Sequence, residues 1–75
     1  MKSLINIKKN YLVKIEKIMG SPVQQERLQD LGFIPGTLTS LIAKLPFNGA
    51  LACKIHGTKL AVRHEDAECI LVSAA

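Results

Sequence analysis

The chain has 75 residues, of which 48% are hydrophobic and 21% charged. This length suits one small folded domain and excludes a multistep enzyme with its own cofactor domain. The formal net charge is +4, but basic and acidic residues are interspersed, which is not typical of nucleic-acid binding. We therefore expect a single domain over residues 1–75 that does not bind nucleic acid.

The sequence predicts a cytoplasmic location. Two cysteines are too few for the disulfide framework of a small secreted fold. The first residues lack the apolar run of a signal peptide, and no stretch approaches the 18 apolar residues of a membrane span. The five lysines among the first 17 residues are interpreted as a solvated face and a protected strand edge.

The first regular element is predicted over residues 10–18. Val13 and Ile15 alternate with Lys14 and Glu16, the pattern of a strand with one buried face. The alternation slips at Lys17, which predicts a bulge or bend at that point.

One clear helix follows, over Pro22–Leu31. Ser21 is placed to cap it, proline occupies the first helical position, and Gln24 has the spacing of a capping box. Gly32 then supplies the positive φ that commonly ends a helix. A helix this short is marginal alone, so we expect its leucine face to dock on a sheet.

The second half reads as strands separated by tight turns. Turns are predicted at Pro35-Gly36, of type II, at Asn48-Gly49, and at His56-Gly57 as a two-residue hairpin link. The predicted strands are 37–44, 50–55, 58–62 and 70–72, with a short helical turn over 64–69 before the last one. The pattern indicates a mainly all-β fold: a small, closed or partly closed five-stranded antiparallel barrel with one short α-helix.

One block of this sequence resembles a known family. Residues 27–37, RLQDLGFIPGT, are similar to the RL-x-x-LG-[FM]-x-PG signature of the FeoA family of bacterial ferrous iron uptake. The segments LPFNG at 45–49, LAVR at 60–63 and EDAECILV at 65–72 are similar to later family patterns. The chain departs from the family at Ala50-Leu51, where an Asp-Pro pair is common, and at Asn10, where glycine is common.

The resemblance implies an SH3-like barrel and an accessory role without catalysis. It implies a partner, the cytoplasmic part of the FeoB Fe²⁺ transporter, which would hold the protein at the inner membrane. Similar modules form the C-terminal domain of DtxR-type repressors, so a metal-responsive regulatory domain is the alternative. No DNA-binding domain precedes the module here, which favours the stand-alone form.

No enzyme motif or cofactor site is apparent. His64-Glu65-Asp66 is interpreted as a solvated charged turn, because adjacent side chains diverge. Cys53 and His56 have a ligand-like interval, but residues three apart on a strand face opposite sides, so we expect Cys53 in the core. The remaining metal-ligand candidates are His56, His64 and Cys69. Such residues could also bind a metal ion together across the contact of a weak homo-oligomer.

A protein–protein role remains, carried by apolar residues at the helix and in loops. For Phe33, capping of a barrel end and contact with a partner both stay open, whereas Phe47 is expected to protrude. The candidate partner-binding residues are Leu28, Phe33, Ile34, Leu45, Pro46 and Phe47. The residues expected to shape caps and turns are Ser21, Gly32, Pro35, Gly36, Asn48, Gly49 and Gly57.

Overall fold

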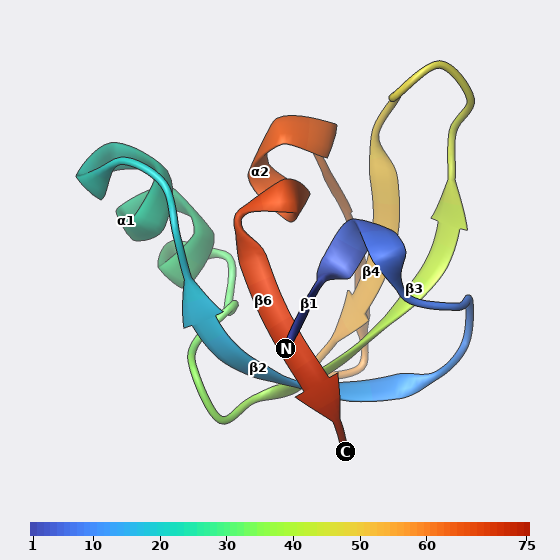
Figure 1. Cartoon of the computed structure of the whole chain (residues 1–75), viewed down its shortest axis with the longest axis horizontal. Coiled ribbons are helices and arrows are strands. Elements are labelled where there is room, and N and C mark those ends of the chain that lie inside the picture. Colours follow the sequence, from blue (N-terminus) through green and yellow to red (C-terminus); the bar gives the residue numbers. More distant parts are fainter.

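A computed structural model describes all residues, 1–75, and its strands form one antiparallel sheet (Figure 1). The order across the sheet is β1-β6-β2-β3-β4-β5. The bounds are β1 Lys2–Ser3, β2 Leu12–Ile18, β3 Leu38–Lys44, β4 Leu51–Ile55, β5 Thr58–Val62 and β6 Ile70–Ala74. The mainly β architecture is therefore as predicted.

Three short helical segments accompany the sheet: a 3₁₀ turn at Leu4–Asn6, α1 at Pro22–Asp30 and α2 at His64–Glu68. The predicted capping box of α1 is present, because the Gln24 backbone N–H donates to Ser21 Oγ at 3.2 Å and Ser21 N–H donates to Gln24 Oε1 at 3.0 Å. Leu31 is the C-cap of α1. None of these helices has the length and apolar character needed to span a bilayer.

Two details of the predicted barrel are wrong. The sheet has six strands, because the two-residue β1 pairs with β6 and gives no signal of its own in the sequence. The sheet is also not closed, since β1 and β5 each pair with only one neighbour. Of the two predicted forms, the closed barrel is therefore wrong, and the partly closed one agrees with a sheet that keeps two edges.

Two irregularities curve the sheet. The β2–β6 register shifts between Ile15 and Lys17, which confirms the bulge predicted at Lys17. A second shift lies between Leu41 and Ala43 where β3 pairs with β4. A bulge bends its strand and raises the local twist, so the sheet wraps around the core.

The core is aliphatic, with Phe33 as its single aromatic residue. One residue from α1, Leu28, joins it at 0% exposure, so the helix packs on the core through this leucine as expected. Leu31, expected on the same docking face, is 44% exposed and does not join the core. Cys53 is buried on β4, as predicted. The full hydrophobic cluster is Leu4, Val13, Ile15, Ile18, Leu28, Phe33, Leu41, Leu51, Cys53, Ile55, Val62, Ala67, Ile70 and Val72.

Two of the three predicted tight turns form as expected. In the first, Thr37 N–H donates to Ile34 O at 3.0 Å, and Gly36 has φ +94° at the third position of a type II turn. In the second, His56 and Gly57 link β4 to β5 with φ of +51° and +76°. The third turn lies one residue earlier than predicted and belongs to the site described next.

Candidate partner-binding surface

The turn between β3 and β4 is centred on Phe47 and Asn48, not on Asn48 and Gly49 as the sequence predicted. Phe47 has φ +59° and Asn48 has φ +56°, while Gly49 is not in the left-handed region. Gly49 N–H donates to Pro46 O at 3.2 Å and closes the turn. The shift places a phenylalanine where glycine or asparagine is favoured.

Phe47 carries two unfavourable features at once. Its side chain is 100% exposed, and its backbone is held in a conformation that costs a bulky residue about 1–3 kcal/mol. Neither feature contributes to the stability of the fold. A strained, fully exposed aromatic side chain at a loop tip is typical of an interface anchor.

Leu45 and Pro46 extend this apolar tip. Leu45 is 60% exposed, and its N–H donates to Ala50 O at 3.0 Å at the base of the loop. A groove of about 530 Å³ lies beside the turn, lined by the loop together with Ile5, Asn6, Lys44, Leu51 and His64. We call the turn 45–49 and this groove the hairpin site.

Two predicted contact residues, Leu28 and Phe33, are wrong as surface candidates. Both are 0% exposed. Phe33 N–H donates to Leu28 O at 3.0 Å, and Gly32, with φ +108°, donates to Gln29 O at 3.0 Å. These two bonds are those of a Schellman motif, which turns the chain inward after the helix. Phe33 therefore packs in the core, whereas Ile34 stays 49% exposed.

The predicted contact surface also does not form one continuous face. Figure 1 shows α1 at one side of the molecule and the β3–β4 turn at the opposite upper side. Two exposed apolar residues, Val23 on α1 and Leu31 at its C-cap, line a separate shallow depression with charged neighbours. The hairpin site and the helix surface are thus two distinct candidates, and only the hairpin site carries backbone strain.

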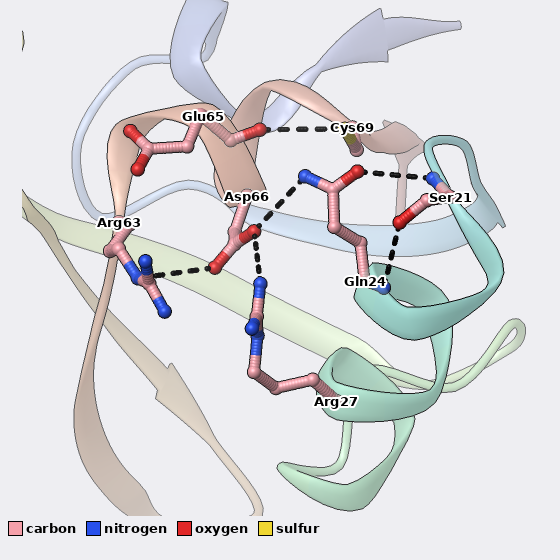
Figure 2. A network of polar contacts seen from close by, with 7 residues as sticks. All are labelled: Ser21, Gln24, Arg27, Arg63, Glu65, Asp66 and Cys69. Atoms are coloured by element: carbon pink, nitrogen blue, oxygen red, sulfur yellow. Dashed lines mark hydrogen bonds and ion pairs between the residues drawn. The ribbon is translucent and has the colours of Figure 1, made fainter.

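The predicted charged turn at residues 64–66 is wrong for Asp66, which is only 5% exposed (Figure 2). Arg27 Nη2 and Gln24 Nε2, both from α1, each donate to Asp66 Oδ1 at 3.3 Å. Arg63 Nε lies 3.8 Å from Asp66 Oδ2. We call this group the Asp66 cluster; it ties α1 to α2 and satisfies a buried carboxylate. No local sequence signal links Asp66 to partners about 40 positions earlier.

The metal-ligand candidates do not converge. His56 is exposed at the β4–β5 turn, His64 lines the hairpin groove, and Cys69 donates from Sγ to Glu65 O at 3.4 Å. No group of three histidine, cysteine, aspartate or glutamate side chains is placed to hold a metal ion.

Both thiols are held in their protonated form, which is the weaker metal ligand. Burial raises the pKa of Cys53 to about 11. Burial and then the negative charges of Asp66 and Glu68 raise the pKa of Cys69. Near neutral pH neither cysteine is therefore a thiolate.

Known structures share this fold. FeoA-like protein from Clostridium acetobutylicum superposes with a TM-score of 0.86 at 25% identity, over 97% of this chain and 85% of that one. Stenotrophomonas maltophilia FeoA, complexed with zinc and described as an SH3 domain protein, gives a TM-score of 0.81 at 22% identity, over 97% and 91%. A manganese-dependent transcriptional repressor superposes with a TM-score of 0.89 at 15% identity, over 99% of this chain but only 41% of that one.

Whole-sequence comparison with curated proteins finds no match. At the level of families, the FeoA domain matches residues 2–74, which is nearly the whole chain. The chain therefore belongs to the FeoA domain family.

Proposed function

We propose that this protein is an accessory factor of bacterial ferrous iron uptake that binds the cytoplasmic part of a FeoB-type Fe²⁺ transporter. Membership of the FeoA domain family and relatives named as iron(II) transport and iron uptake regulatory proteins support the iron-uptake role. The observation that carries the binding role is Phe47, fully exposed at positive φ. The protein would act from the cytoplasmic side and reach the membrane through this partner.

The hairpin site is the proposed contact. An aromatic side chain that enters a pocket of the partner loses all of its exposed surface on binding, and aromatic anchors of this kind dominate interface energetics. Leu45 and Pro46 would seal the contact around Phe47. Ile34 does not line the groove, so we leave it out of the proposed contact.

A pull-down and calorimetric titration against the cytoplasmic domain of FeoB tests the proposal, with GTP and with GDP. We expect binding by the wild-type protein and a loss of at least thirtyfold in affinity for Phe47→Ala, since a hot-spot truncation costs about 2 kcal/mol or more. The matched control is Val23→Ala, which shortens another strongly exposed apolar side chain on α1. No binding in either nucleotide state, or equal losses for both variants, would contradict the proposal.

The alternative function is a metal-responsive regulatory domain like that of DtxR-type repressors. The shared fold with a manganese-dependent repressor supports this alternative. The ligand candidates are scattered and form no metal site, which counts against it. Calorimetric titration with Zn²⁺, and with Fe²⁺ under anaerobic conditions, separates the two functions. Tight stoichiometric binding to the isolated protein would favour the alternative over the accessory role.

A further inference from the structure

The net positive charge of this protein comes from its first 18 residues. That segment holds five lysines and one acid, Glu16, whereas residues 19–75 hold five basic and five acidic residues. The formal net charge of +4 is therefore the net charge of residues 1–18 alone. The acidic residues of the remainder lie on α1 and α2.

Most of these lysines have no acidic partner. Glu16 lies 3.8 Å from Lys14 Nζ, and no other lysine forms an ion pair. Lys8 Nζ instead lies 5.9 Å from the centre of the Tyr11 ring, within range of a cation–π contact. Lys9 is exposed in the turn before β2. Unpaired lysines that are close together repel one another and favour an anionic partner.

Exposed apolar side chains lie among these lysines. Tyr11 is 61% and Leu12 55% exposed at the start of β2. Tyr11 lines a groove of about 470 Å³ that opens between the first residues and β6. Its lining is six hydrophobic residues together with Lys2, Asn6, Lys8 and Ser73, with no acidic side chain. A mainly apolar groove that includes Lys2 and Lys8 matches a ligand with an apolar body and an anionic head.

We propose that this surface, formed by Lys2, Lys8, Lys9, Tyr11 and Leu12, docks directly on an anionic phospholipid bilayer. Lysines attract the headgroups, while tyrosine and leucine enter the boundary between headgroups and acyl chains. A nucleic acid fits less well, because its recognition favours arginine, and all basic groups in this segment are lysines. The binding does not require a protein partner and is additional to the FeoB contact.

The arrangement gives the protein a defined orientation on the membrane. Figure 1 shows the segment before β2 at one side of the molecule and α1 at the opposite side. Docking by the lysine surface would place acidic α1 away from the negative bilayer.

Co-sedimentation with vesicles tests the proposal. We expect the protein to sediment with vesicles of 30% phosphatidylglycerol in phosphatidylcholine at low salt, but not with pure phosphatidylcholine, and to be released by 0.5 M NaCl. Lys8→Gln and Lys9→Gln should each lower the partition coefficient about fivefold. The matched control is Lys17→Gln, which removes the same charge at the other end of β2 and should change partition less than twofold. Equal losses for Lys9→Gln and Lys17→Gln would show a net-charge effect and overturn the proposal.

A second measurement detects insertion. The chain has no tryptophan, so Tyr11→Trp provides a single reporter at the proposed contact. Its emission should shift to the blue on addition of the anionic vesicles and stay unchanged with duplex DNA at the same salt. An unchanged spectrum with vesicles, or retention on DNA without sedimentation on vesicles, would overturn the bilayer assignment.

Discussion

The α1–α2 side of the molecule and the β3–β4 turn differ in whether their residues are in favourable environments for the fold. At the first, the buried Asp66 carboxylate has partners on both of its oxygens (Figure 2), and α1 ends in a complete capping motif. At the second, a phenylalanine is both strained and fully exposed to water. The comparison teaches that the Asp66 cluster stabilises the fold, whereas the hairpin site does not, which is why we propose it as the partner contact.

Gly32→Val should produce the largest effect, on the structural side of this comparison. A β-branched residue at φ +108° is strongly disfavoured, and the added Cβ would lie 3.4 Å from His56 Cδ2. We expect a loss of about 2–3 kcal/mol in the free energy of unfolding, measured by urea denaturation. Gly32→Asn, which tolerates the left-handed region, should lose less than half as much. A loss below about 0.5 kcal/mol for valine would contradict the assigned helix end.

Asp66→Asn should come next. It keeps the size of the side chain but removes the charge that faces Arg27 and Arg63. Because these arginines are 43% and 64% exposed, solvent screens the pairs, and we expect a loss of about 1–2 kcal/mol. The control is Glu65→Gln, an exposed neighbour in no ion pair. Equal effects for the two variants would mean that the cluster is not specific.

Phe47→Asn should have the smallest effect on stability, and in the opposite direction. Asparagine tolerates positive φ, so the free energy of unfolding should rise by about 0.5–1 kcal/mol while FeoB binding is lost. His56→Asn is the control, since His56 also has positive φ at a hairpin turn but lies outside the hairpin site. The His56→Asn variant should be at least as stable as the wild-type protein and should bind FeoB with unchanged affinity. Lower stability for Phe47→Asn would indicate that Phe47 supports the fold.

Local patterns made much of the fold predictable. The spacing of Ser21, Pro22 and Gln24 predicted α1, and the alternation around Val13 predicted β2 together with its bulge. These features depend on neighbours within four residues, which a sequence displays directly. The open sheet and the short β1 depend on pairing between the two ends of the chain, and no local pattern encodes that pairing.

The candidate site was predicted less completely for the same reason. Exposed apolar loop residues identified Phe47, but turn preferences favoured Asn48-Gly49 and missed the strain at Phe47 itself. Apolar character alone could not separate the buried Phe33 from the exposed Ile34, because the Schellman motif decides which of them turns inward. Asp66 was missed because its partners lie on a distant helix.

Iron uptake in living cells tests the central claim most directly. Anaerobic ⁵⁵Fe²⁺ uptake should fall when the gene is deleted and recover with the wild-type protein or with Val23→Ala. At equal protein levels, Phe47→Ala should not restore uptake. Unchanged uptake after deletion, or full recovery with Phe47→Ala, would contradict the proposal that the hairpin site carries the function.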